Sequence, residues 1–346
     1  MKKISVVGTV GLPACYGGFE SLVDNLNNYR TNGIKYVIYC SSKTYKDKIK
    51  EYKGAELRYI NLKANGIQSI LYDVFSLAKC LFYKTDVILI LGVSGCIFLP
   101  LLKYISKSKV ITNIDGLEWK RDKWNSLARW FLKKSEYFAV KYSDVVIADN
   151  IAISEYVNTT YGVYPEVIAY GGDHAVQFNT EKKRSDYFFS VCRIEPENNI
   201  KMILDSFAKT TKKLKIVGNW NNSIYGSNLR KNYSQYANLD LIDPVYDQEE
   251  LFYLRDNCIG YIHGHSAGGT NPSLVEAMHF AVNIYAFDCS FNRYTTENNA
   301  FYFKNSDELI ALISKNMEHN IGPEMSAIAN REYTWRVITE KYESLY

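Results

Sequence analysis

A glycine-rich segment ahead of an apolar helix is the stretch of this sequence best suited to bind a ligand. It reads GGTNPSLVEAM over residues 268–278. Pro272 suits the first helical turn, where no backbone N–H is needed, and Asn271 or Thr270 can cap the helix. The free amides and the positive end of the helix dipole favour an anion, and a diphosphate satisfies them best. Glu276, one turn into the helix, can accept hydrogen bonds from a ribose diol, so the segment predicts a bound nucleotide.

The neighbouring segments place this helix in a parallel sheet. Residues 261–266, YIHGHS, are typical of a strand that ends with His263 and His265, and residues 281–287, AVNIYAF, of the next buried strand. Strand, glycine loop, helix and strand form the unit that brings ligands to the carboxyl ends of a parallel sheet. The alternative is a tight turn before a core helix, with Glu276 merely solvated.

Composition limits the class of protein. The chain has 346 residues, of which 47% are hydrophobic, enough for two domains with full cores. Its seven cysteines include no CxxC spacing, which favours a reducing compartment over a zinc ribbon or disulfide scaffold. Residues 1–15 imitate a lipoprotein signal, but Gly8 and Gly11 interrupt the apolar run and favour a first strand. No stretch reaches the roughly 20 apolar residues of a spanning helix.

The charge is distributed unevenly along the chain. Residues 1–173 carry 23 Lys and Arg against 16 Asp and Glu, whereas the overall net charge is only +4. Basic residues concentrate in 119–141, where Trp119, Trp124, Trp130 and Phe131 interleave with lysines and arginines. This pattern predicts a helix that docks on an anionic membrane surface. The alternative is a helix whose aromatic side chains pack inward. No nucleic acid is expected, because no known binding motif accompanies the charge.

Hydrophobic periodicity predicts an α/β fold with two doubly wound halves. In the first half the expected strands are 4–7, 36–39, 57–60, 87–91, 110–114 and 145–148, and the main expected helices are 19–29, 68–83 and 126–142. Those of the second half are 187–191, 214–217, 239–241, 258–262 and 282–287, with helices near 200–210, 248–257 and 272–280. A hinge is expected near 170–173, and the ends of two such sheets would leave a cleft between them.

Four segments together carry a resemblance to a known family. They are GTVGLPACYGGFESLVDNL (8–26), NIDGLEWKRDKW (113–124), CRIEPENN (192–199) and HGHSAGGTNPSLVEAM (263–278). In this order they resemble the retaining glycosyltransferases of GT-B fold in the glycogen-synthase-like superfamily (family 4-like), and more narrowly the rhamnosyltransferase branch of bacterial capsule and exopolysaccharide assembly.

The resemblance implies a fold and a division of labour. Two Rossmann-like doubly wound domains would face each other across a cleft. Residues 1–170 would bind the acceptor and residues 171–330 the nucleotide sugar. Residues 331–346 would form a helix that crosses back onto the first domain, with Trp335 as its anchor.

The resemblance also assigns roles to residues. Arg193 would bind the diphosphate, Glu276 the ribose, and the glycine turn of the first domain would approach the phosphates. The full set of implied donor-binding residues is Gly17, Gly18, Arg193, Asn198, Gly218, Asn219, Val245, Tyr246, His265, Gly268, Gly269, Thr270, Asn271 and Glu276. The implied catalytic residues are Asp115, Arg193 and Glu276, and Asp115 and Glu118 lie on the acceptor side. The last two are equally consistent with helix-capping carboxylates.

The implied reaction is transfer of a sugar, L-rhamnose from dTDP-rhamnose or a sugar from a UDP-linked donor, to a lipid-linked saccharide with retention. It would occur in the cytoplasm, at the inner face of the cell membrane. Neither a metal nor a cofactor is expected, because the sequence has no DxD triplet. His263 and His265 lack a matching third ligand, which favours a loop-shaping or sugar-contact role over metal binding.

Two departures and two rival interpretations remain open. Gly268 stands where the superfamily often has a glutamate, and Asn198 where a lysine usually follows the diphosphate arginine. A catalytically silent carbohydrate-binding or scaffold protein is therefore one rival. The other is an NAD-dependent oxidoreductase, because Gly8, Gly11 and Ala14 have the spacing of a degenerate dinucleotide fingerprint, although the acidic residue expected after the second strand is missing.

Overall fold

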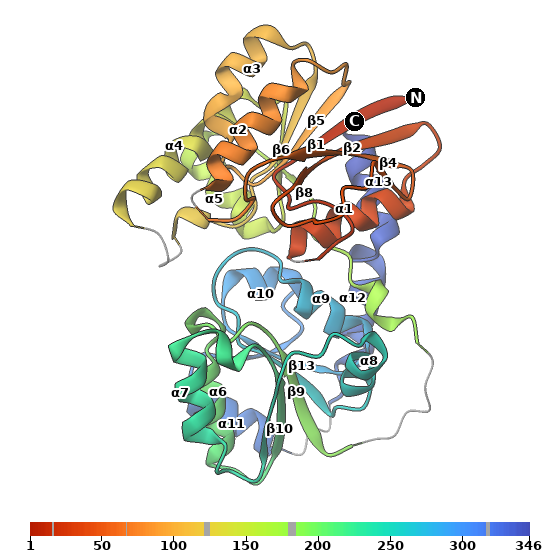
Figure 1. Ribbon diagram of the computed structural model, residues 1–346. Coiled ribbons are helices and arrows are strands. Elements are labelled where there is room, and N and C mark those ends of the chain that lie inside the picture. Colours follow the sequence, from red (N-terminus) through yellow and green to blue (C-terminus); the bar gives the residue numbers. More distant parts are fainter. Residues whose placement is uncertain (16, 67, 121–124, 179–184, 316–318) are drawn as a thin grey trace. The chain divides into compact units, whose positions relative to one another are not determined.

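The computed structural model of the protein describes residues 1–15, 17–66, 68–120, 125–178, 185–315 and 319–346 (Figure 1). The chain divides into two compact units. Unit 1 comprises Met1–Ala169 together with Trp335–Tyr346, and unit 2 comprises Tyr170–Thr334. Each unit has its own sheet covered by helices, so the predicted α/β class is confirmed.

Unit 1 contains an eight-stranded sheet in the order β3-β4-β2-β1-β5-β6-β7-β8, in which only the β3–β4 pair is antiparallel. Its central strands read as apolar runs because helices cover both faces, and all five residues of β5 are buried. The strands are β1 (Lys2–Val7), β2 (Ile34–Ser41), β3 (Glu51–Tyr52), β4 (Ala55–Ile60), β5 (Val87–Leu91), β6 (Lys109–Asn113), β7 (Val145–Ala148) and β8 (Glu166–Val167).

The helices of unit 1 are divided between the two faces of this sheet. From β1 the chain moves to β2 in one direction across the sheet, and from β4 it moves in the opposite direction to β5, β6 and β7. Because such connections are right-handed, α1 lies on one face of the sheet and α2, α3 and α4 lie on the other. The helices are α1 (Gly18–Tyr29), α2 (Gln68–Cys80), α3 (Leu99–Ile105), α4 (Ser126–Tyr142), α5 (Ile151–Tyr161) and α13 (Trp335–Ser344), with the 3₁₀ turns η1 (Cys96–Phe98) and η2 (Glu118–Lys120).

The C-terminal helix α13 packs on unit 1 and contacts α1. Trp335 is fully buried at its start. Near its end, the Tyr342 hydroxyl accepts a hydrogen bond of 2.8 Å from Asn113 Nδ2, and the Leu345 carbonyl accepts one of 2.6 Å from Lys109 Nζ. The last segment of the chain thus supports the loop that follows β6.

Unit 2 is a six-stranded parallel sheet in the order β11-β10-β9-β12-β13-β14. Its core includes Phe188, Phe207 and Trp220, and the indole N–H of Trp220 donates to the Ile242 carbonyl at 2.9 Å. The strands are β9 (Tyr187–Val191), β10 (Lys213–Val217), β11 (Leu239–Ile242), β12 (Gly260–His263), β13 (Asn283–Phe287) and β14 (Phe301–Phe303). The helices are α6 (Ile200–Ala208), α7 (Ile224–Tyr233), α8 (Gln248–Asp256), α9 (Pro272–His279), α10 (Ser290–Thr295), α11 (Ser306–Ser314) and α12 (Gly322–Glu332), with the 3₁₀ turn η3 (Asp173–Val176).

The predicted elements agree closely with the observed ones. Three strands and the helix at 126–142 have the expected bounds, whereas the helix expected over 68–83 already ends at Cys80. Apolar residues continue past that end, but Phe82 and Tyr83 lie exposed rather than in a helical core. None of the helices in the described part of the chain is long and apolar enough to span a bilayer.

Candidate functional site

The start of helix α9 has the geometry expected for an anion-binding turn. Asn271, not Thr270, is the capping residue: its Oδ1 accepts from the backbone N–H of Ser273 at 3.0 Å, whereas Thr270 is buried. Pro272 occupies the first helical turn. The other first-turn amides, those of Leu274 and Val275, donate to the Asn271 carbonyl at 3.0 and 3.3 Å. What this helix start offers an anion is therefore the positive end of its dipole.

Glu276 is held by two basic side chains that sequence patterns did not indicate. Its carboxylate pairs with Arg255 of α8, and its Oε1 lies 3.3 Å from Nε2 of His174 in η3. Burial raises the pKa of the Glu276 carboxyl, but the charge of Arg255 and the hydrogen bond from His174 outweigh this and hold the pKa below its ordinary value. The carboxylate is therefore ionised and oriented, which excludes the interpretation of Glu276 as merely solvated.

Gly172 explains how η3 comes so close to helix α9. A Cβ atom added at Gly172 would lie 2.8 Å from the backbone nitrogen of Glu276 and 2.8 Å from the carbonyl carbon of Val275. Only glycine permits this approach, which places His174 against Glu276. The GGD sequence at 171–173 was the available signal, but it indicated only a hinge.

The loops that follow β9 and β12 meet at the point where the strand order of unit 2 reverses. Asn199 Nδ2 donates to the Gly264 carbonyl at 2.8 Å, and His265 Nδ1 lies 2.7 Å from Asn198 Oδ1. The backbone N–H of Ser266 donates to the Glu197 carbonyl at 2.9 Å. In open α/β sheets this switch point is where ligands bind.

Arg193 and Asn198 have different environments within the loop after β9. The Arg193 side chain is 46% exposed, with a carboxylate oxygen of Glu195 at 3.5 Å from its Nη1. Asn198 is buried; its Nδ2 donates to the Arg193 carbonyl at 2.7 Å while its Oδ1 faces His265. Asn198 thus replaces the usual lysine with an amide that fixes the loop bearing Arg193.

Backbone conformation accounts for Gly268 at the position where the resemblance implies a glutamate. Its φ is +109°, a region that side chains rarely adopt. An added Cβ would also lie 3.4 Å from His265 Nε2. A glutamate here would require a different path for the loop between β12 and α9.

The end of β10 also supports the Arg193 loop. Asn219 Oδ1 accepts from the backbone N–H of Ile194 at 2.9 Å, and a Cβ on Gly218 would lie 2.4 Å from Ile194 Cδ1. Val245 and Tyr246 follow β11, two strands from β9; Val245 is half-buried, and Tyr246 is 86% exposed. Gly218 and Asn219 therefore lie next to the Arg193 loop, as expected for donor-binding residues. Val245 and Tyr246 lie farther from it, after the edge strand of the sheet.

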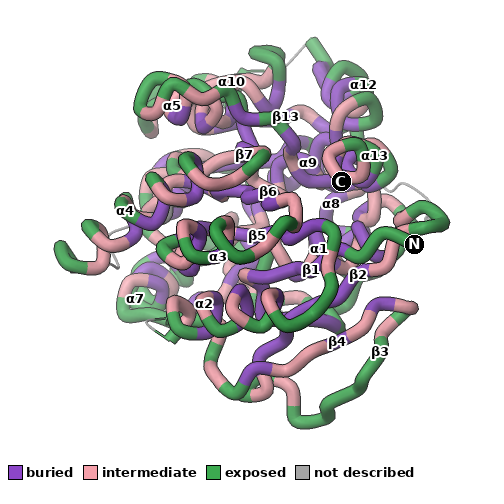
Figure 2. The backbone as a smooth tube through the Cα atoms, turned by 90° about the horizontal axis from the view of Figure 1, so that it is seen from above, coloured by how far each residue is buried: buried purple, intermediate pink, exposed green. Residues whose placement is uncertain are grey.

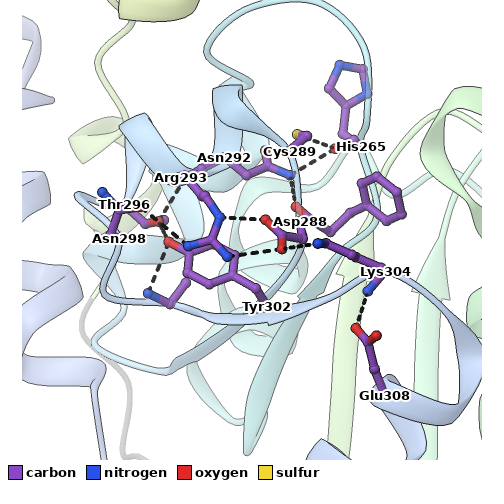
Figure 3. A network of polar contacts seen from close by, with 12 residues as sticks. His265, Asp288, Cys289, Asn292, Arg293, Thr296, Asn298, Tyr302, Lys304 and Glu308 are labelled. Carbon is purple, nitrogen blue, oxygen red and sulfur yellow. Dashed lines mark hydrogen bonds and ion pairs between the residues drawn. The ribbon is translucent and has the colours of Figure 1, made fainter.

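A polar network involving β13 and α10 fixes residues 263–266, which we call the HGHS loop (Figure 3). Asn292 Nδ2 donates to the carbonyls of His265, at 2.9 Å, and Phe287, at 2.8 Å. Arg293, next to it, binds Asp288 with two nitrogens and lies over the Tyr302 ring. The loop is thus tied to β13 and α10.

His263 differs from His265 although both belong to the HxH sequence. It is buried, and its Nε2 has no hydrogen-bond partner among the described residues. Burial, followed by the neighbouring His265, lowers the pKa of His263 well below its ordinary value, so its ring is neutral. His263 faces the interior of unit 2 while His265 contacts the loop after β9.

Unit 1 has a pocket of about 560 Å³ at its own switch point, between β1 and β5. Its wall includes Gly8, Gly92 and Asp115 together with apolar side chains. Asp115 has a positive φ of 59°, and its N–H donates to Asn113 Oδ1 at 2.9 Å. Since Asn113 also contacts α13, the C-terminal helix helps to position Asp115.

Asp73 is a pocket residue that sequence reasoning missed. It lies on α2, lines the pocket with Ser94, and accepts a hydrogen bond from the Ser94 hydroxyl. Burial raises the pKa of the Asp73 carboxyl to about 7, and the Ser94 hydrogen bond opposes this only in part. A single carboxylate between Tyr72 and Val74 in an apolar helix was the only available signal.

We expect Asp73→Asn to change how stability depends on pH. Between about pH 4 and pH 7 the folded protein keeps the Asp73 proton that the unfolded chain has released, so its stability falls as pH rises. Asparagine does not titrate. The free energy of unfolding of the variant should therefore rise relative to that of the wild type by about 4 kcal/mol between pH 4 and pH 7. Urea denaturation at several pH values measures it; parallel profiles would contradict a buried titrating Asp73.

The two glycines of the turn at the start of α1 do not line this pocket, although the next residue along the chain, Phe19, does. Gly17, with φ +91°, and Gly18 are exposed, and the wall residues nearest to them in sequence are Gly8 and Phe19. The buried Glu20 accepts from Val10 N–H at 2.6 Å and so fixes the preceding loop. Glu118 belongs to η2, but the position of its side chain lies outside what the structure describes.

The basic segment 119–141 is only partly described, since Arg121, Lys123 and Trp124 lie outside the described residues. Membrane contact would require Trp119 and Lys133 to face solvent together, and they do not. The Trp119 indole N–H donates to the buried Glu136 at 2.9 Å, and Lys133 Nζ lies 3.0 Å from the same carboxylate and over the Trp119 ring. They pack inward because Glu136 needs donors, and only Trp130 among the described tryptophans of the segment is well exposed.

Solved structures of low sequence identity share this fold over nearly their full length. Sucrose-phosphate synthase from Thermosynechococcus elongatus has a TM-score of 0.80 at 14% identity, covering 100% of this chain and 98% of that one. Anabaena Alr3699/HepE in complex with UDP-glucose has a TM-score of 0.75 at 15% identity, covering 100% and 99%. A glycosyltransferase from Rickettsia africae ESF-5 reaches 0.74 at 12%, covering 99% and 97%.

These likenesses establish the class: the chain has the GT-B fold. The family model described as "Domain of unknown function (DUF1972)" matches residues 1–173, half of the chain, and the protein belongs to this family. No curated protein matches the sequence.

Proposed function

We propose that this protein is a metal-independent glycosyltransferase that moves L-rhamnose from dTDP-rhamnose to a lipid-linked saccharide, with retention, in the assembly of a cell-surface polysaccharide. One observation carries the transferase assignment. In unit 2 the Arg193 loop is hydrogen-bonded to the HGHS loop, and that loop leads directly into the capped helix α9 with its oriented Glu276. An exposed guanidinium, the positive end of a helix dipole and a fixed carboxylate together suit a nucleoside diphosphate.

The same residues suggest how transfer proceeds. Arg193 and the positive end of the α9 dipole stabilise the negative charge that grows on the departing diphosphate. That phosphate accepts the proton of the acceptor hydroxyl on the face it leaves, so no protein nucleophile is needed for retention. Glu276 holds the ribose, and Arg255 and His174 keep the carboxylate ionised and in place.

The acceptor is proposed to bind in the pocket of unit 1. The wall is mostly apolar, with Phe131 and Ile70 among its residues, and the carboxyl groups of Asp73 and Asp115 supply polar contacts. Such a pocket suits a saccharide that carries an apolar portion. A lipid-linked acceptor at the inner face of the cell membrane has this chemistry.

A donor panel tests the function. The purified protein is incubated with dTDP-rhamnose, UDP-glucose, other nucleotide sugars and NAD, together with a lipid-diphosphate saccharide, and the products are weighed. Transfer from dTDP-rhamnose is expected. If only a UDP-linked sugar is transferred, the donor is that sugar and not dTDP-rhamnose. If no nucleotide stabilises the fold, the interpretation as a catalytically silent scaffold protein is favoured.

The oxidoreductase alternative gains no support from the local structure. Helix α1 begins at Gly18, so Gly8, Gly11 and Ala14 do not open a helix as a dinucleotide fingerprint requires. A Cβ on Gly11 would lie 2.5 Å from Cys40 Sγ, which shows that this glycine serves close packing inside unit 1.

Activity is expected to survive removal of divalent cations. The sequence has no DxD triplet to hold a metal at the diphosphate, and Arg193 with the positive end of the α9 dipole provides positive charge instead. Transfer rates before and after incubation with EDTA measure this. A large loss that only magnesium or manganese restores would contradict the metal-independent mechanism.

A further inference from the structure

Helices α2, α3 and α4 of unit 1 lie side by side, each with exposed turns (Figure 2). On α2, Leu71 and Phe75 are exposed one helical turn apart, and Phe82 follows just beyond the helix end. Residues at i and i+4 lie on the same side of a helix. The outer side of α2 is therefore apolar, although its inner side already packs on the sheet.

The two neighbouring helices repeat this arrangement. Exposed apolar residues are Leu101, Tyr104 and Ile105 on α3, and Leu127 and Trp130 on α4. A groove at the C-terminal ends of α2 and α3 is lined by both Phe82 and Ile105, so the apolar rows of these two helices adjoin. We call the outer sides of α2, α3 and α4, with the residues that directly follow α2 and α3, the α2–α3–α4 face.

Positive charge predominates on the α2–α3–α4 face, although the groove between α2 and α3 also contains the exposed Asp86. The three helices, which the structure describes throughout, contain only two acidic residues, Asp73 and Glu136, and both are buried. Their exposed charged residues are all lysines, and two more lysines follow the ends of α2 and α3: Lys79, Lys134, Lys141, Lys84 and Lys107. Beyond the helix ends, Asp86 accepts from the Lys3 amide and Asp144 pairs with Lys103.

The α2–α3–α4 face also reaches the acceptor pocket. Leu127 and Trp130 are exposed on α4 and line the pocket wall at the same time. A molecule anchored in whatever covers this face would therefore have direct access to the pocket.

We propose that the α2–α3–α4 face is a docking surface for an anionic lipid bilayer. Aromatic and aliphatic tips enter the headgroup region while lysines contact anionic headgroups, which is how interfacial helices bind. Five exposed lysines among exposed aromatic and aliphatic side chains favour an anionic bilayer over a protein partner, because lysine is depleted at protein interfaces. The link to a lipid-borne acceptor rests on the proposed function, but the docking itself does not.

Vesicle flotation of the full chain tests the inference. Wild-type protein is expected to float with vesicles of phosphatidylcholine and phosphatidylglycerol, and not with phosphatidylcholine alone. Phe82→Ser combined with Tyr104→Ser should weaken binding at least about tenfold, since these side chains are 84% and 89% exposed and their loss leaves the core intact. Tyr164→Ser, at an 82% exposed tyrosine of unit 1 outside the face, is the matched control and should bind like wild type.

A second pair of variants tests the charge. Replacing Lys79, Lys84 and Lys107 with Glu should abolish binding to the anionic vesicles, because about 1 kcal/mol of attraction per lysine is reversed. The control replaces Lys43, Lys46 and Lys48, exposed elsewhere on unit 1, and should keep binding. No flotation of the wild type, or equal loss in both triple variants, would overturn the proposal.

Nucleotide binding separates this inference from the proposed function. The Phe82→Ser/Tyr104→Ser variant is expected to bind dTDP or UDP like the wild type, because its changes lie in unit 1. Flotation without nucleotide binding would refute the transferase assignment and keep the docking surface. Nucleotide binding without flotation would refute the docking surface and keep the transferase assignment.

Discussion

Glu276→Ala is expected to lower the free energy of unfolding by about 3 to 5 kcal/mol, because it leaves the guanidinium of Arg255 buried without its carboxylate. In the fraction that folds, nucleotide affinity should fall about 5- to 150-fold, the equivalent of about 1 to 3 kcal/mol for a lost hydrogen-bonding carboxylate. Urea denaturation measures the first effect, and calorimetric titration with dTDP and UDP measures the second.

Two comparisons make this result specific. Asp186→Ala removes an exposed carboxylate that pairs with Lys213 in the same unit and should leave the melting temperature unchanged. Glu276→Gln keeps the shape of the side chain and an acceptor oxygen, so it should bind nucleotide better than the alanine variant does. Wild-type nucleotide affinity in folded Glu276→Ala protein would show that this carboxylate does not hold the ribose.

Arg193→Ala is expected to reduce the rate of sugar transfer about 100- to 1,000-fold, because a preorganised donor to the departing diphosphate is lost. Stability should change little, since the side chain is 46% exposed and its ion-pair partner among the described residues is Glu195, itself 37% exposed. Arg193→Lys should restore part of the rate, because an ammonium keeps the charge but loses the forked geometry that matches a phosphate. Steady-state assays with saturating donor separate an effect on kcat from one on KM.

Arg230→Ala provides the matched control for Arg193. Arg230 is also a partly exposed arginine of unit 2, but its guanidinium is paired with Asp243, just after the edge strand β11, at 2.6 Å. Its replacement should leave the transfer rate unchanged. Equal rates for the Arg193→Ala variant and the wild type would remove the diphosphate role from Arg193.

Sequence patterns were most informative where a local rule dictates the structure. The start of α9 at Pro272 depends on neighbouring residues only, so spacing predicts it. Spacing also predicts a polar cap just before it, while the structure decides that Asn271 rather than Thr270 provides that cap. The bounds of β5 and β9 likewise follow from apolar runs that are buried on both faces of a parallel sheet. The basic segment 119–141 shows the limit, since periodicity cannot tell that the buried Glu136 draws Trp119 and Lys133 inward.

The sequence by itself determined the α/β class, the main strands and helices, and the two segments, CRIEPENN and HGHSAGGTNPSLVEAM, that form the candidate donor site. Only the tertiary structure decided which distant side chains complete that site. Arg255 and His174 reach Glu276 from α8 and η3, and Asp73 reaches the unit 1 pocket from α2. Ion pairing, burial and close packing join residues through space, and no periodicity along the chain encodes such partners.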